Sequence, residues 1–455
     1  MVQNNEDTIV AEATPKGRGG VGIVRISGSK TVEIAKKLLK KVPNVREAEY
    51  LSFRDIDGSV LDCGIALFFK GPHSFTGEDV LELQGHGGSV VMDSIIAAVL
   101  TSGARMALPG EFSLRAFLNN KIDLLQAEAV SDLIDAASKT AAQSAMRSLQ
   151  GEFSKTIGEL IKELTTLRMY IESAIDFPEE EIDFLKETKI FSKINDLIER
   201  VEKIKKEAHC GILMSEGIKV VIMGRPNAGK SSLLNVLLGE DRAIVTPIPG
   251  TTRDILRETI SIDGLLVELV DTAGLRAEAD IIEQEGIRRA LQEIVLADHL
   301  VLVVDKSETL ETNPSLLFPE WIHEIPTTLK ITVLTNKIDK LNLEPDRIET
   351  DDYTVIGVSA KTKAGIDIFK EHLKKVVGFE IPRQGHFMAR RRHLEALTRA
   401  LAHLEAGKTE WQSSHSIELL AEELRLAQLQ LGQITGRVSS DDLLGKIFSE
   451  FCIGK

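Results

Sequence analysis

The chain of 455 residues is long enough for about three domains, at roughly 100 to 200 residues each. Apolar residues make up 43% of it and charged residues 27%, which is ordinary for a globular protein, and no apolar run approaches the ~18 residues of a membrane span. The net charge of −14 disfavours indiscriminate nucleic-acid binding through a bulk positive field, but it does not exclude a local basic patch.

The cysteines and the N-terminus indicate the cellular compartment. Cys63, Cys210 and Cys452 are scattered and form no C-x-x-C pair, which argues against a disulfide framework and against a zinc site. The N-terminus lacks the basic segment and following apolar segment of a signal peptide. We therefore expect a cytoplasmic protein that does not bind membranes.

Residues 1–119 are predicted to form a mixed α/β domain. The glycine-rich run at residues 17–22 has the spacing of a dinucleotide-binding fingerprint, but it leads into a β-branched strand instead of a helix, so we interpret it as a turn. The run at residues 85–88 lacks a matching nucleophile elbow, and His86 is therefore predicted to lie in a turn. Strands are expected at residues 8–11, 22–26, 64–69 and 80–83, and an amphipathic helix at residues 30–41.

Two helical parts bracket the middle of the chain. Residues 120–213 have apolar side chains at i, i+4 spacing, with a clear break only at residues 176–178, and residues 383–455 return to this pattern. The most economical interpretation is one helical domain built from both parts, with residues 216–380 inserted into it; two separate helical domains are the alternative. The basic run at residues 390–393 is either a local basic patch or a solvated helix end.

Residues 216–380 contain four short motifs in the order typical of guanine-nucleotide-binding domains. The first, at residues 224–231, follows an apolar run and opens a helical pattern, as a phosphate-binding loop requires. Its backbone N–H groups would close on the phosphates, Lys230 would reach the β- and γ-phosphates, and the hydroxyl of Ser231 would bind Mg²⁺. This motif alone does not distinguish GTP from ATP.

The other three motifs complete the pattern, and two of them would contact the base. Asp271 begins an Asp-Thr-Ala-Gly motif at the end of an apolar segment, where a Walker-B-type aspartate reaches the Mg²⁺ shell. Asp339 ends an Asn-Lys-Ile-Asp motif, and its carboxylate can accept from the N1–H and the 2-amino group of guanine, a donor pair that adenine lacks. In the Ser-Ala-Lys motif, the N–H of Ala360 is expected to face guanine O6. The four motifs together predict a GTP-binding domain.

The residues that would cleave GTP differ from those of Ras-like proteins. Leu275 occupies the position of the water-orienting glutamine, and leucine has neither a donor nor an acceptor. Two candidates remain: the side-chain carbonyl of Asn227, which can hold a monovalent cation against the phosphates, and the acidic run at residues 278–283. For Glu283 taken alone, a solvated carboxylate at a helix start is the competing interpretation.

The combination of motifs resembles one family. Four segments are similar to those of MnmE (TrmE), the tRNA modification GTPases: residues 224–232, 249–254 and 271–276, and the terminal Phe-Cys-Ile-Gly-Lys at 451–455. Residues 14–22 and 81–88 match as well, so the resemblance covers essentially the whole chain. The terminal Cys-Ile-Gly-Lys is its most diagnostic element.

This resemblance implies a fold, an activity and partners. The implied fold is multidomain α/β and α: an α/β N-terminal domain that binds folate and dimerises, then a helical domain with an inserted P-loop (Ras-like) α/β GTPase domain. The implied activity is GTP hydrolysis coupled to the addition of an aminomethyl or carboxymethylaminomethyl group at C5 of the wobble uridine of certain tRNAs. The implied cofactors are K⁺, Mg²⁺ and 5-formyl- or methylene-tetrahydrofolate, and FAD enters only through a MnmG-type partner in a heterotetramer.

The resemblance also assigns site residues, position by position. The tetrahydrofolate contacts correspond to Arg25, Glu82, Lys121 and Lys455. The K⁺ ligands correspond to Asn227, Thr246, Ile248 and Thr251, the Mg²⁺ ligands to Ser231 and Thr252, and the acidic residue linked to hydrolysis to Glu283. The predicted GTP contacts are Asn227, Ala228, Gly229, Lys230, Ser231, Ser232, Thr246, Pro247, Ile248, Pro249, Gly250, Thr251, Thr252, Asp271, Thr272, Ala273, Gly274, Asn336, Lys337, Ile338, Asp339, Ser359, Ala360 and Lys361.

The chemistry of the side chains supports the folate assignment. A pterin has the same 2-amino-4-oxo edge as guanine, so the carboxylate of Glu82 would bind it as an aspartate binds guanine. The cations of Arg25, Lys121 and Lys455 suit the anionic tail of a folate or its formyl group. Cys452 is a nucleophile toward C6 of uridine, a one-carbon relay, or a small buried packing residue.

Two other classes of function stay open from the sequence. A ribosome-assembly GTPase would bind RNA as a switch without covalent chemistry, but such proteins usually append an RNA-binding module, and the appended helices here are acidic overall. A purely regulatory GTP switch would have no use for a folate-binding domain. Binding of tetrahydrofolate therefore separates the first interpretation from both alternatives.

Overall fold

The computed structural model describes residues 7–176, 187–241, 256–271, 292–319, 322–380, 387–436, 441–449, 451 and 454. The chain forms two compact units. One comprises Met1–Ser131, Ser148–Ile198 and Arg399–Lys455, and the other comprises Asp132–Arg147 and Glu199–Thr398. The first unit contains one sheet and most of the long helices, and the second contains the other sheet.

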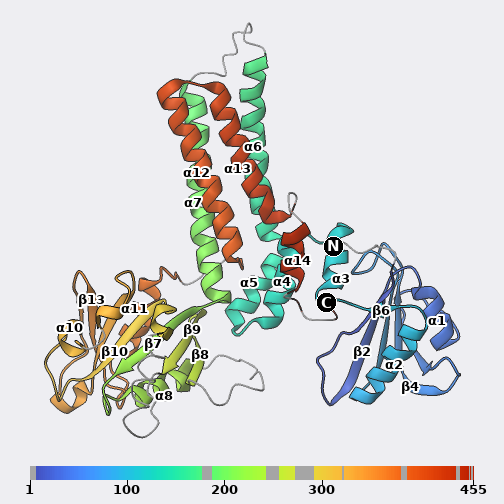
Figure 1. The fold of residues 1–455 in the computed structure, drawn as a ribbon, viewed down its shortest axis with the longest axis horizontal. Helices are drawn as coiled ribbons and strands as arrows, with labels where there is room; N and C mark the ends of the chain where they lie inside the picture. Colours follow the sequence, from blue (N-terminus) through green and yellow to red (C-terminus); the bar gives the residue numbers. More distant parts are fainter. Residues whose placement is uncertain are drawn as a thin grey trace. The chain divides into compact units, whose positions relative to one another are not determined.

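A six-stranded sheet of order β3-β4-β5-β2-β1-β6 forms the N-terminal part of the first unit (Figure 1). Neighbouring strands are antiparallel, except that β1 and β6 are parallel. Helices α1 and α2 pack against this sheet. The elements are β1 (Ile9–Glu12), β2 (Gly19–Ser27), α1 (Thr31–Leu39), β3 (Glu49–Arg54), β4 (Val60–Phe69), β5 (Val80–Gly87), α2 (Ser89–Thr101), β6 (Arg105–Met106) and, after the sheet, α3 (Glu111–Leu118).

Side chains alternate across β2 and β5, because successive residues of a strand point to opposite faces. Arg25 of β2 lies directly opposite Glu82 of β5 in the strand register. Both are only partly buried, and each stands between two fully buried residues. The alternation therefore places these two predicted site residues on the face away from the core. The buried residues of that core include Val24, Ile26, Ile34, Leu38, Leu81, Leu83, Met92 and Ile95.

Most predicted elements of this domain are confirmed, with three corrections. The first glycine-rich run does lead into a strand, but β2 already starts at Gly19, so residues 19–22 belong to the strand and not to a turn. β3 was not predicted. The prediction for His86 was wrong, because this residue lies within β5 and its Nδ1 is 2.8 Å from Oδ1 of Asp62. β5 continues beyond the predicted strand because Gly87 still pairs with Gly19, a close approach in which a Cβ on Gly87 would lie 2.7 Å from the Val21 oxygen.

Helices from both helical parts pack together. Nη1 of Arg168 in α6 donates to Oε1 of Gln428 in α13 at 2.6 Å, and Figure 1 shows these two helices side by side. Nζ of Lys408 in α12 lies 5.1 Å from the ring centre of Phe191 in α7. One helical domain built from both parts is thus confirmed, whereas the residue numbers of the domain boundaries stay predictions. The helices are α4 (Leu124–Asp135), α5 (Lys139–Leu149), α6 (Glu152–Asp176), α7 (Glu187–Ser215), α12 (Arg391–Ser414), α13 (Ile417–Thr435) and α14 (Asp441–Ser449).

The second unit contains a seven-stranded sheet of order β12-β13-β11-β10-β7-β9-β8. Its five inner strands are parallel and the two edge strands are antiparallel to their neighbours. All seven residues of β10 are buried, as expected for a strand covered on both faces. The elements are β7 (Ile218–Gly224), α8 (Lys230–Asp241), β8 (Leu256–Ile262), β9 (Leu265–Asp271), β10 (His299–Asp305), α10 (Pro314–Leu317), β11 (Lys330–Asn336), β12 (Arg347–Glu349), β13 (Tyr353–Gly357) and α11 (Ile366–Val376).

The nucleotide motifs follow the carboxyl ends of these parallel strands. The phosphate-binding motif comes after β7, Asp271 ends β9, and Asn336 ends β11. Ligands of open parallel sheets bind at this edge, since the loops that follow the strands meet there. The fold is that of a P-loop α/β domain, and it brings the motifs to one side of the sheet.

Candidate functional site

The phosphate-binding loop connects β7 to α8. Lys230, the first residue of α8, is buried, and its Nζ donates to the backbone oxygens of Gly224 at 2.8 Å and Arg225 at 3.0 Å. At Gly229 the backbone is left-handed, with a φ of +93°, and a Cβ there would overlap Nδ2 of Asn336. Only glycine fits this position, so the loop keeps the open backbone that a phosphate cradle needs.

Asn336 connects three of the nucleotide motifs. Its Nδ2 donates to the backbone oxygen of Ala228 in the phosphate-binding loop at 2.9 Å. Its Oδ1 accepts from the N–H of Lys337 at 2.8 Å and from the N–H of Ala360 at 3.1 Å. We expected the Ala360 N–H to face guanine O6, but in this structure it is bonded to Asn336, because Asn336 lies buried between the two loops.

The carboxylate of Asp339 is held by the neighbouring motif. Its Oδ1 accepts from Oγ of Ser359 at 2.5 Å, and that hydroxyl oxygen accepts in turn from the N–H of Thr362 at 3.2 Å. The Thr362 N–H and the Ser359 hydroxyl together fix the orientation of the Asp339 carboxylate. The arrangement agrees with a carboxylate that is positioned to accept from a base.

Asp305 is a site residue that the sequence analysis missed. This buried carboxylate ends β10, and its Oδ2 accepts from Nζ of Lys337 at 2.6 Å. The same Nζ donates to the backbone oxygen of Asn227, also at 2.6 Å. Burial acts to raise the pKa of Asp305, but the hydrogen bonds from Lys337 and Ser307 outweigh burial and lower this pKa to about 2. Asp305 thus holds the lysine that joins the base motif to the phosphate loop.

Several predicted GTP and metal contacts lie outside the described residues. They are Thr246, Pro247, Ile248, Pro249, Gly250, Thr251, Thr252, Thr272, Ala273, Gly274 and Glu283. Asp271 is described only as the last residue of β9. Asn227, with a left-handed φ of +62°, and Ser231, in the first turn of α8, do lie in the loop and helix start that the metal assignments require.

A second cluster lies on the N-terminal sheet. Nε of Arg25 donates to Oε1 of Glu82 at 2.8 Å, so the two predicted folate residues on this face form an ion pair. Nη1 of Arg25 also donates to the backbone oxygen of Gly454 at 3.3 Å. The end of the chain therefore reaches the same guanidinium. Cys452 and Lys455, which flank this contact in sequence, lie outside the described residues.

Two glycines leave the space that the end of the chain occupies. Gly454 is buried with a φ of +98°, and a Cβ on it would overlap the backbone oxygen of Glu12. Gly110 has a φ of +64°, and a Cβ on it would lie 2.5 Å from the backbone oxygen of Phe448 and 2.9 Å from Cβ of Phe451. The close fit explains why these positions are glycine, since neither has room for a side chain.

Lys121, the remaining predicted folate residue, contacts a loop of the same domain. Its Nζ donates to the backbone oxygen of Pro72 at 2.8 Å, and its stem carbons lie 3.4 Å from where a Cβ on Gly77 would be. Lys121, Arg25 and Glu82 are all described, and no hydrogen bond or ion pair links Lys121 to either of the other two. The structure places Lys121 against residues 72–77, which connect β4 to β5.

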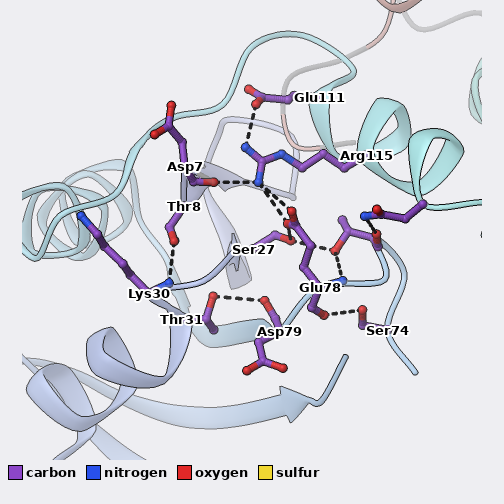
Figure 2. Close-up of polar contacts among 12 residues, drawn as sticks. Asp7, Thr8, Ser27, Lys30, Thr31, Ser74, Glu78, Asp79, Glu111 and Arg115 are labelled. Atoms are coloured by element: carbon purple, nitrogen blue, oxygen red, sulfur yellow. Dashed lines mark hydrogen bonds and ion pairs between the residues drawn. The ribbon is translucent and has the colours of Figure 1, made fainter. Parts of the chain in front are cut away.

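The same loop is anchored by a buried ionic network (Figure 2). The guanidinium of Arg115, with 3% of the residue exposed, donates to Glu78 at 3.0 Å, to Glu111 at 3.0 Å and to the backbone oxygen of Asp7 at 2.7 Å. Glu78 also accepts from Oγ of Ser27 at 2.7 Å. Sequence reasoning did not identify this network, whose members come from four segments far apart in the chain.

Two arginines of the basic run at residues 390–393 form ion pairs within their own unit. Arg390 pairs with Asp132 at 2.9 Å and Arg391 pairs with Glu216 at 2.6 Å. His393 is buried, and its Nδ1 accepts from the N–H of Arg390 at 3.0 Å. Among the described residues, no cluster of three or more His, Cys, Asp or Glu side chains is suited to hold a metal, and no helix has the length and apolarity to cross a bilayer.

Two family models match nearly the whole chain. The model of the MnmE helical domain matches residues 124–452, and the model of the GTP-binding protein TrmE N-terminus matches residues 8–121. The chain belongs to the MnmE (TrmE) family. It is accordingly a tRNA-modification GTPase that binds and hydrolyses GTP. The MnmE helical match spans the GTPase sheet as well, in agreement with an insertion between the two helical parts.

Solved structures of other GTP-binding proteins are also similar to this MnmE-family chain. The G domain of the T. maritima FeoB iron transporter is 24% identical over 35% of this chain and 98% of its own, with a TM-score of 0.26. Aquifex aeolicus Era bound to GDP and AlF4⁻ is 23% identical over 41% of this chain and 66% of its own, with a TM-score of 0.27. A GTP-binding protein from Sulfolobus solfataricus in complex with GDP is 21% identical over 60% and 78%, with a TM-score of 0.26.

Proposed function

We propose that this GTPase takes part in adding an aminomethyl or carboxymethylaminomethyl group at C5 of the wobble uridine of certain tRNAs, with a tetrahydrofolate as the one-carbon donor. One observation carries the proposal: Arg25 pairs with Glu82 and also holds Gly454, which lies 429 residues further along the chain. A cation, a carboxylate and the end of the chain converge on one sheet face. A purely regulatory GTPase gives no reason for this convergence.

The residues present suit a reduced folate. The carboxylate of Glu82 can accept from the 2-amino group and ring N–H of a pterin, and Nε of Arg25 donates to the same carboxylate at 2.8 Å. Lys121 and Lys455 add cations for the carboxylates of the folate tail. When bound, the folate supplies the one-carbon unit. Arg25 orients the carboxylate of Glu82 and binds the backbone oxygen of Gly454, so that Gly454 would lie beside the bound folate.

The proposed GTPase cycle uses the assigned metal ligands. Ser231 and Thr252 would hold Mg²⁺, and Asn227, Thr246, Ile248 and Thr251 would hold K⁺ against the phosphates, where positive charge stabilises the transition state. Glu283 would orient or deprotonate the attacking water. We further propose a homodimer in which association of two GTPase domains controls chemistry at the folate site, a MnmG-type FAD protein as partner, and a cytoplasmic location.

Calorimetry of 5-formyl-tetrahydrofolate binding to the full chain tests the proposal. The parent protein should bind, and Glu82→Gln should weaken binding by about tenfold or more, since a hydrogen bond to a charged group is lost. Glu33→Gln, on the exposed side of α1, should bind like the parent. Absence of binding by the parent protein would contradict the proposal and favour an RNA-binding assembly GTPase without covalent chemistry.

A further inference from the structure

Phe75 is an exposed aromatic side chain beside the Arg25–Glu82 pair. It is 39% exposed, while its neighbours Ser74 and Thr76 are 9% and 0% exposed. The centre of its ring lies 5.9 Å from Cζ of Arg25. Thus the one large apolar residue of residues 74–77 faces outward where the proposed folate site lies.

The same guanidinium has a second aromatic neighbour. The ring centre of Phe112 lies 5.8 Å from Cζ of Arg25, and Phe112 is completely buried. Phe112 therefore supports Arg25 from the interior, and Phe75 supports it from the open side. A ring needed only to pack against the guanidinium would gain more by being buried, as Phe112 is, because apolar burial is favourable.

The loop that carries Phe75 is fixed on both sides. Oγ1 of Thr76 lies 2.7 Å from Oγ of Ser27, and the backbone oxygen of Thr76 accepts from Nδ2 of Asn119 at 2.7 Å. Oγ of Ser74 donates to the backbone oxygen of Glu78 at 2.5 Å, and Figure 2 shows Glu78 bound to Arg115. These bonds hold the ring at the surface before any ligand arrives, and such preorganisation lowers the entropy cost of binding.

We propose that Phe75 is a ligand-binding residue of the folate site, which contacts the planar pyrimidine half of the pterin through its ring face. The inference rests on the proposed function and deepens it. A pterin whose amino edge is held by Glu82 would still need an apolar surface for its flat face. Phe75 is the exposed aromatic ring that contacts the cation paired with Glu82.

The test is calorimetry of 5-formyl-tetrahydrofolate with the full chain, without tRNA or GTP. Phe75→Ala and Phe75→Leu should raise Kd by about tenfold to a hundredfold, the range for loss of one aromatic stacking partner. Phe75→Trp should restore binding, since it keeps a ring face. Tyr50→Leu is the matched control, because Tyr50 is a 75% exposed aromatic residue of β3 in the same sheet.

Two fragments of the folate molecule identify which part of the ligand contacts Phe75. A reduced 6-methylpterin should compete less well for Phe75→Leu than for the parent, whereas p-aminobenzoylglutamate should compete equally for both. Unchanged affinity of all Phe75 variants for 5-formyl-tetrahydrofolate would overturn the inference, and so would lost uridine modification at unchanged folate affinity, which would assign the ring to tRNA. If the parent itself fails to bind folate, the proposed function is contradicted and this inference falls with it.

Discussion

At the scale of single residues, Gly454 decides whether the end of the chain can lie in the N-terminal domain. Its left-handed φ and its approach to the Glu12 backbone exclude every other residue type, and its backbone oxygen meets Arg25. Steric fit thus explains why this position of the Cys-Ile-Gly-Lys segment is a glycine.

Gly454→Ala should therefore displace the tail. We expect uridine modification with the partner protein to fall at least tenfold, measured by mass spectrometry of the tRNA nucleosides, while GTP turnover stays within about twofold. Gly58→Ala is the control, because Gly58 also has a positive φ, of +90°, but a Cβ there meets nothing within 4 Å. Normal modification by Gly454→Ala would show that the tail does not need this contact.

A second prediction at this scale concerns Asp339. Since Ser359 holds one of its oxygens, the carboxylate is oriented for a base with two donors. Asp339→Asn should weaken GTP binding by about 1.5 to 3 kcal/mol for each charged hydrogen bond lost and shift preference toward xanthosine triphosphate. Fluorescence titration with both nucleotides measures this. A variant that retains the preference of the parent for GTP would remove Asp339 from the base site.

At the scale of elements, the pairing of β10 with β11 creates a contact that the sequence analysis did not reveal. Asp305 stands opposite Asn336 in the parallel register, which brings it to Lys337. The sequence shows a carboxylate after an apolar run, but which strand lies beside it depends on the order of the whole sheet. This is why the four motifs were predictable from local pattern and Asp305 was not.

Other elements differ in how far local pattern reveals them. Strands β7 and β9 correspond to the two apolar runs that were noted before motifs. β3 was missed because it lies at the edge of its sheet and mixes polar and apolar residues. The network around Arg115 was missed because its partners, among them Asp7, Ser27 and Glu78, meet only after the sheet has formed.

The low pKa of Asp305 gives a prediction at this scale. Its folded pKa of about 2 lies below the usual value of about 3.9, so its ion pair stabilises the protein above roughly pH 4 and is lost as the pH falls toward 2. Asp305→Asn should lower the free energy of unfolding by about 1 to 3 kcal/mol at pH 7. The difference should shrink below pH 4.

Urea unfolding of both proteins from pH 7 to pH 3 measures this difference. Asp351→Asn, at an exposed position after β12, is the control and should match the parent. A difference between Asp305→Asn and the parent that stays constant down to pH 3 would contradict the assigned role of the Asp305–Lys337 pair.

At the scale of the whole molecule, hydrolysis and modification are assigned to different domains. Without a glutamine at Leu275, we expect K⁺ at Asn227 and the residues 246–252 to stabilise the transition state. GTP turnover should rise steeply with K⁺ and not with Na⁺, whose smaller radius suits the same ligands poorly. Glu283→Ala should lower kcat by roughly 10² to 10⁴ with little change in GTP affinity. Equal turnover in the two salts would show that the catalytic groups are misassigned.

Deletion of residues 452–455 tests most directly whether the chain's end acts together with the Arg25–Glu82 pair. The truncated protein should lose wobble-uridine modification and bind 5-formyl-tetrahydrofolate more weakly, because it lacks the Gly454 oxygen that binds Arg25 and the proposed folate residue Lys455. Its GTP turnover in K⁺ should remain close to that of the parent. Undiminished modification by the truncated protein would contradict the central claim that this tail completes the active site.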